Sequence, residues 1–129
     1  MLTYLLDTNI LIDLATQKNS ASFFEKIIQS KATTLVTSII CVAEFLTKSS
    51  REEEKFLKKF IESGELEVIG FQFMQEALKA GELRKKLGLR LPDAIVLMTC
   101  ENRSTTLLTH DKEFFQKAKS VVKSIDPFS

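Results

Sequence analysis

Short apolar segments alternate with longer segments of helical periodicity along the chain, and this alternation constrains the fold more than any other feature. The short segments are typical of β-strands because they are apolar and end at polar or turn-forming residues. The predicted strands cover Leu2–Leu6, Thr34–Val36, Leu66–Ile69, Thr105–Leu108 and Val121–Ile125. Helical segments between successive strands act as crossovers, which makes the strands parallel. We therefore expect an α/β fold: a three-layer sandwich with a short central parallel sheet flanked by helices.

The predicted helices are amphipathic, with one exception. They begin near Ile10, Ser20, Ser38, Arg51, Gln72, Pro92 and Asp111. The helix over Gln72–Leu87 is expected to turn Met74, Ala77, Leu78 and Leu83 inward. The exception is Pro92–Glu101, which is apolar nearly all round. We therefore expect that helix to be buried.

Length and charge exclude several classes of protein. The 129 residues suit a single domain spanning 1–129, and 44% hydrophobic residues exclude a disordered chain. The net charge is only +1, so a purely electrostatic nucleic-acid binder is excluded. Cys41 and Cys100 lie in apolar runs and are interpreted as buried, reduced thiols. The start of the chain lacks the positive charge of a signal peptide and no apolar run is long enough to span a bilayer. We expect a cytoplasmic protein with no membrane segment.

Four acidic residues stand where the fold predicts a site. Asp7 directly follows the first strand, and Asp111 comes just after the Thr105–Leu108 strand. Glu44 lies inside a mostly apolar helix, and Asp93 occupies the first turn of the buried one. Parallel sheets bind ligands beyond the carboxyl ends of their strands, near the point where the strand order reverses. These four side chains are therefore expected to converge there.

Each acid also has a purely structural interpretation. Asp7 can cap the helix that follows it. Asp93 and Asp111 can complement helix macrodipoles, and Glu44 can pair with Lys48 one turn later. The sequence leaves these alternatives open.

Several carboxylates in one pocket repel one another unless a cation binds or some stay protonated. Oxygen ligands select hard ions such as Mg²⁺ or Mn²⁺, and Mg²⁺ needs only one or two direct carboxylates. Such an ion polarises a phosphoryl group and activates water. The acids therefore indicate metal-dependent hydrolysis of phosphodiester bonds.

Four segments carry a family resemblance. They are Leu5-Leu6-Asp7-Thr8-Asn9, Ser38 with Val42-Ala43-Glu44-Phe45, Leu91-Pro92-Asp93-Ala94, and Leu108-Thr109-His110-Asp111. In this order the chain resembles a PIN domain, and its length resembles the VapC-like toxins. The resemblance implies a PIN-like fold and a ribonuclease that uses Mg²⁺ or Mn²⁺. It also implies a toxin paired with an antitoxin, and a homodimer.

The resemblance also implies roles for particular residues. Asp7, Glu44, Asp93 and Asp111 fall on the acidic positions of the family. Asp7 and Asp93 would hold the metal, and Glu44 and Asp111 would act directly or through water. Asn9 matches a polar position that supports the first Asp. His110 stands where many relatives have an Arg, and we interpret it as a partly exposed loop side chain rather than a general base.

Basic residues near the acids are candidates for contacting RNA: Lys48, Arg84, Lys85, Arg90 and Lys112. A charge run on a helix is equally typical of a solvated face. Phe23, Phe24, Phe56 and Phe60 give two predicted helices more aromatic surface than a small sheet covers. The resemblance implies a dimer and an antitoxin groove near these helices, and the alternative is a monomer in which these phenylalanines are internal. Two other functions remain: a PIN-like module that binds RNA or protein without catalysis, and a phosphatase or phospho-receiver. The second lacks the usual Asp-x-Asp, since Asn9 replaces the second acid.

Overall fold

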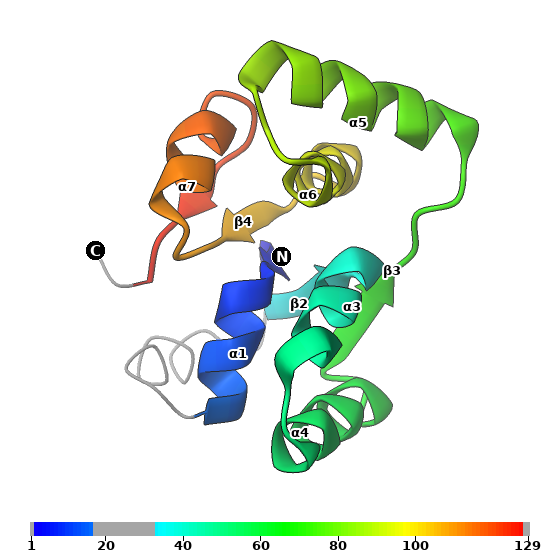
Figure 1. The fold of residues 1–129 in the computed structure, drawn as a ribbon, viewed down its shortest axis with the longest axis vertical. Helices are drawn as coiled ribbons and strands as arrows, with labels where there is room; N and C mark the ends of the chain where they lie inside the picture. The colour runs from blue at the N-terminus through cyan, green and yellow to red at the C-terminus, as the bar shows by residue number, and fades with distance from the viewer. Residues whose placement is uncertain (1, 17–32, 128–129) are drawn as a thin grey trace.

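A computed structural model describes residues 2–16 and 33–127, which form a parallel sheet flanked by helices (Figure 1). The strands are β1 (Leu2–Leu6), β2 (Thr33–Ser38), β3 (Leu66–Ile69), β4 (Thr106–Leu108) and β5 (Ser124–Ile125). The helices are α1 (Thr8–Thr16), α3 (Ile39–Lys48), α4 (Arg51–Glu62), α5 (Met74–Leu87), α6 (Leu91–Arg103) and α7 (Lys112–Ala118). The predicted α/β sandwich is confirmed.

The strand order is β3-β2-β1-β4-β5, and every pairing is parallel. The chain first builds outward from β1 through β2 to β3, and then returns to the other side of β1 with β4 and β5. The order therefore reverses between β1 and β4. In a parallel sheet this reversal opens a crevice at the carboxyl ends of the two strands.

The core lies between the sheet and the helices. Leu5 and Leu6 of β1 and Leu107 and Leu108 of β4 are fully buried. Helix α6 is buried from Asp93 to Cys100, as its apolar composition predicted. Cys41 and Cys100 are buried free thiols, also as predicted.

Two element predictions need correction. The last strand was predicted from Val121, but it begins only at Ser124 because Val121 and Val122 donate backbone hydrogen bonds to Ala118 and close the turn after α7. Conversely, β2 is longer than predicted, from Thr33 to Ser38, because it pairs with both β1 and β3. The helix predicted from Ser20 lies outside the described residues.

The inward face of α5 is also different from the prediction. This helix packs on the outer side of α6 (Figure 1) and buries Ala80 and Leu83. Met74 and Leu78, which were predicted to point inward, are 72% and 62% exposed. The prediction failed because only one narrow side of α5 meets the rest of the protein.

None of the described helices is long and apolar enough to cross a membrane.

Candidate active site

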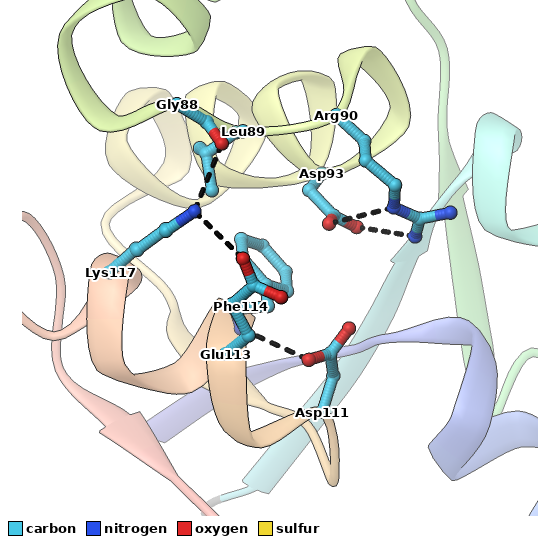
Figure 2. A pocket seen from close by; sticks show the side chains of 8 residues that line it. All are labelled: Gly88, Leu89, Arg90, Asp93, Asp111, Glu113, Phe114 and Lys117. Carbon is cyan, nitrogen blue, oxygen red and sulfur yellow. Dashed lines mark hydrogen bonds and ion pairs between the residues drawn. The ribbon is translucent and has the colours of Figure 1, made fainter.

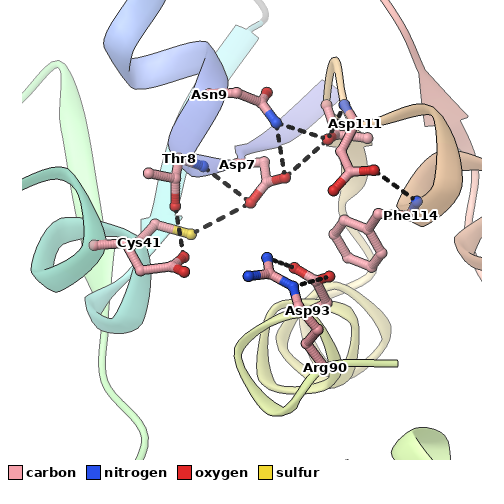
Figure 3. A network of polar contacts seen from close by, with 10 residues as sticks. Asp7, Thr8, Asn9, Cys41, Arg90, Asp93, Asp111 and Phe114 are labelled. Carbon is pink, nitrogen blue, oxygen red and sulfur yellow. Dashed lines mark hydrogen bonds and ion pairs between the residues drawn. The ribbon is translucent and has the colours of Figure 1, made fainter. Parts of the chain in front are cut away.

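The four predicted acids come from four separate parts of the fold. Asp7 directly follows β1, and its backbone N–H donates to the Leu108 carbonyl at the end of β4. Asp111 precedes α7, Glu44 lies on α3, and Asp93 is in the first turn of α6. Figure 3 shows the side chains of Asp7, Asp93 and Asp111 facing one region.

Asp7 is the centre of the polar network, and it is only 5% exposed. Its Oδ1 accepts a hydrogen bond from the Thr8 backbone N–H at 2.9 Å. Its Oδ2 accepts from Thr109 Oγ1 at 2.8 Å and from Asn9 Nδ2 at 3.3 Å. Burial raises the pKa of Asp7 to about 6, and the negative charges of Asp93 and Glu44 add to that rise. A buried carboxylate beside other negative charges is stabilised when it binds a proton or a cation.

Asn9 donates a hydrogen bond to Asp7. Besides its bond to Asp7, its amide donates to Thr109 Oγ1, and its Oδ1 accepts from the His110 backbone N–H. Asn9 thus ties the end of β1 to the loop after β4.

Thr109 and Thr8 were not predicted as site residues. Thr109 is fully buried, and its hydroxyl donates to Asp7 while accepting from the Asp111 N–H. The signal available in the sequence was its position directly after β4. A threonine is common in loops, so this signal is weak.

Glu44 points toward the same network. Its Oε1 accepts a hydrogen bond from Thr8 Oγ1 at 2.8 Å. The alternative pairing with Lys48 is not found among the ion pairs of the described residues. The side chain of Cys41 lies beside this group, with Sγ 3.9 Å from Asp7 Oδ1. Burial raises the pKa of the Cys41 thiol, so the thiol keeps its proton.

Asp93 is held by an arginine. Arg90 Nη2 lies 3.1 Å from Asp93 Oδ1, and Arg90 Nε lies 3.3 Å from Oδ2. The guanidinium therefore donates hydrogen bonds to both carboxylate oxygens (Figure 3). The carboxylate side chain is 10% exposed, whereas that of Arg90 is 66% exposed. Burial raises the pKa of Asp93, and the Arg90 charge acts against that rise.

Asp111 has a structural role as well. Its Oδ1 accepts the Phe114 N–H at 3.1 Å and so caps α7. It also lines a pocket of about 60 Å³ with Asp93 and Arg90 (Figure 2). Lys117 borders the same pocket but is engaged elsewhere, by Glu113 and the Gly88 carbonyl. Asp111 therefore caps α7 and also faces this pocket.

The other basic candidates lie on the surface. Lys48, Arg84, Lys85 and Lys112 are exposed. Of the predicted RNA contacts, only Arg90 forms an ion pair with a site acid in the described part of the chain.

His110 lies in the loop after β4 and has a partly exposed side chain, as predicted. The side chain is 12% exposed, and the imidazole lies between two carboxylates, Asp13 on Nε2 and Asp126 on Nδ1. Neither partner belongs to the four acids. The ring therefore links α1 to the end of the chain after β5.

The donor set fits a hard divalent cation. Asp7 and Asp93 offer carboxylate oxygens, and burial raises the pKa of Asp7, with smaller contributions from the charges of Asp93 and Glu44. Within residues 2–16 and 33–127, no three His, Cys, Asp or Glu side chains form a preassembled metal cage. Mg²⁺ needs only one or two direct carboxylates and keeps several waters. Asp7 and Asp93 would therefore suffice as direct ligands.

Comparison with known proteins agrees with this topology. Residues 4–120 match the PIN domain. A chain in the structure of VapBC2 from Rickettsia felis bound to a DNA fragment from the promoter is 23% identical, with a TM-score of 0.72, and the match covers 97% of this chain and 100% of that one. A toxin-antitoxin complex from Klebsiella pneumoniae is 24% identical, with a TM-score of 0.73 and coverage of 96% and 97%.

VapBC-1 from nontypeable Haemophilus influenzae is 22% identical, with a TM-score of 0.72, covering 99% of this chain and 100% of that one. No curated protein sequence matches the chain significantly. These structures share the fold, and the family match spans nearly the whole sequence. The chain therefore belongs to the PIN domain family.

Proposed function

We propose that this protein is a metal-dependent endoribonuclease and the toxin of a type II toxin-antitoxin pair. One observation carries the proposal: acids from three separate elements act on one another, since burial raises the pKa of Asp7 and the charges of Asp93 and Glu44 add to that rise. Mutual repulsion of this kind lowers stability unless a cation or a proton offsets it. The position at the reversal of strand order suits a ligand site.

In the proposed site Asp7 and Asp93 hold Mg²⁺ or Mn²⁺, and Glu44 and Asp111 act directly or through water. A bound cation would polarise the phosphodiester group and activate water for hydrolysis. Asn9 and Thr109 keep the Asp7 carboxylate in one orientation through their hydrogen bonds. Thr8 does the same for Glu44.

RNA would approach along the exposed cations. Lys48, Arg84, Lys85, Arg90 and Lys112 are on the surface, where their charges attract phosphates and offset the repulsion between the acids and RNA.

An antitoxin is the proposed protein partner. The similar structures from Rickettsia felis and Klebsiella pneumoniae are described as VapBC and as a toxin-antitoxin complex. An open hollow of about 400 Å³, lined by Leu14, Phe56 and Phe60 with Lys59, Ser63 and Glu65, offers apolar surface near α4. A helix or tail from the antitoxin would bury apolar side chains there. The homodimer also remains a proposal.

A binding module without catalysis is the second candidate. It is favoured by the ion pair between Arg90 and Asp93, which neutralises one site acid in the absence of metal. The RNA cleavage assay described next separates the two functions.

The test is cleavage of a single-stranded RNA with Mg²⁺ or Mn²⁺. Wild type should cleave, and EDTA should abolish cleavage. Asp93→Asn should lower the rate at least about 100-fold because it removes a ligand charge while keeping the shape. Glu113→Gln is the matched control, since Glu113 lines the same pocket and is 79% exposed. Cleavage in EDTA would contradict metal dependence, and no cleavage by wild type would favour the binding module.

A further inference from the structure

The guanidinium of Arg90 occupies a position that a cation would need. It bonds both oxygens of Asp93, at 3.1 and 3.3 Å. The carboxylates of Asp93, Glu44 and Asp111 all raise the pKa of Arg90, with Asp93 contributing most. The positive charge of Arg90 is therefore felt by three of the four site acids.

A divalent cation at Asp93 would meet this positive charge. Two like charges close to one carboxylate repel each other. In addition, the Nε and Nη2 donors of Arg90 each occupy an acceptor position on an Asp93 oxygen. The cation and Arg90 therefore compete for the same nearly buried carboxylate.

We propose that Arg90 is an internal competitor of the metal: it neutralises Asp93 in the metal-free protein and leaves Asp93 when the cation binds. The proposal rests on the proposed function, because it assumes that Asp93 is a metal ligand. It assigns to Arg90 a role distinct from contacting RNA.

The exposure of Arg90 makes this exchange easy. The arginine side chain is 66% exposed, so the guanidinium regains water when it leaves Asp93. Exposed ion pairs contribute little free energy for the same reason. Asp93 itself stays in place, because it sits in the first turn of the buried helix α6. Only one partner of the pair therefore has to move.

The experiment compares Mn²⁺ affinity in the absence of RNA, by calorimetric titration. Arg90→Gln should bind Mn²⁺ with a Kd about fivefold lower than wild type, a modest gain because the guanidinium of this ion pair is 66% exposed. Arg103→Gln is the matched control. It also removes an exposed arginine from an ion pair, with Glu67, but at the opposite end of α6. Its Kd should equal that of wild type.

Thermal melts give a second measurement that does not depend on activity. In EDTA, Arg90→Gln should melt below wild type, because Asp93 then has no counter-charge. Saturating Mn²⁺ should raise its melting temperature by more than that of wild type.

The outcomes distinguish this proposal from the proposed function. If Arg90→Gln binds Mn²⁺ with the same or lower affinity than wild type, Arg90 is no competitor, while the metal site stands. If neither protein binds Mn²⁺, both the metal site and the role of Arg90 are overturned. An equal gain in affinity in Arg103→Gln would attribute the effect to net charge and would also overturn the proposal.

Discussion

Asp7 shows most clearly how one residue is placed at a cost to stability. Its carboxylate is buried at the end of β1 and accepts hydrogen bonds from Thr8, Asn9 and Thr109. These bonds lower the pKa of Asp7, but burial raises it by more, to about 6. The ionised form is therefore less favourable in the folded protein than in the unfolded chain.

The pH dependence of stability follows from this shift. The folded pKa of about 6 lies above the ordinary value of 3.8, so the stability associated with protonated Asp7 is present below about pH 4 and is lost as pH rises through about 6. Asp7→Asn has no charge to bury. In EDTA, we expect the free energy of unfolding of Asp7→Asn minus that of wild type to increase by about 2 kcal/mol between pH 4 and pH 8.

Urea unfolding at pH 4, 6 and 8 measures this difference. A constant offset is expected as well, because Asn cannot accept every bond that the Asp7 carboxylate accepts. Glu62→Gln serves as the control, since it removes an exposed carboxylate from α4. A difference between Asp7→Asn and wild type that does not grow with pH would contradict the raised pKa of Asp7.

At the scale of the element, α7 combines a helix cap with a site acid. Asp111 accepts the Phe114 N–H and so starts the helix, while its other oxygen faces the pocket (Figure 2). Helix α7 has only 7 residues, so its start depends strongly on this cap.

Two substitutions separate these roles of Asp111. Asp111→Asn keeps a side-chain oxygen that can cap, so stability should stay within about 0.5 kcal/mol of wild type. Asp111→Ala removes the cap and should lower the free energy of unfolding by about 1 kcal/mol. Both should reduce RNA cleavage, because both remove the charge. Chemical denaturation and the cleavage assay test the pair; full activity in Asp111→Asn would leave Asp111 with the cap alone.

At the scale of the whole molecule, the largest exposed apolar side chains gather on and before α5. Phe73, Met74 and Leu78 are 59%, 72% and 62% exposed. By contrast, Phe60 of α4 is only 8% exposed, and Phe56 is half-buried against it. The exposed apolar surface on α5 is therefore a second candidate for association, in addition to the hollow that Phe56 and Phe60 line near α4.

We expect the α5 surface to hold two copies of the chain together. Light scattering at micromolar concentration should give twice 14.6 kDa for wild type. Leu78→Lys should shift the mass toward 14.6 kDa, because burying a charge at the interface is unfavourable. Leu46→Lys is the matched control, at an exposed leucine of α3. A wild-type mass near 14.6 kDa would contradict the dimer.

The sequence by itself determined the layered fold and the four acids. The spacing of apolar residues and the composition of a segment are local properties of the sequence. Short apolar strands and amphipathic helices could therefore be predicted without knowing which elements they pack against. The burial of α6 followed in the same way from its apolar composition. The positions of Asp7 and Asp111 after their strands then identified the edge of the sheet where a site was expected.

Only the tertiary structure decided what each side chain meets. That Thr8 bonds Glu44 and that Thr109 bonds Asp7 depends on contacts between residues 36 and 102 positions apart in the sequence. The same holds for His110, whose imidazole lies between Asp13 and Asp126. Local patterns carry no information on such contacts, because the strand order and the packing of helices on the sheet bring them about.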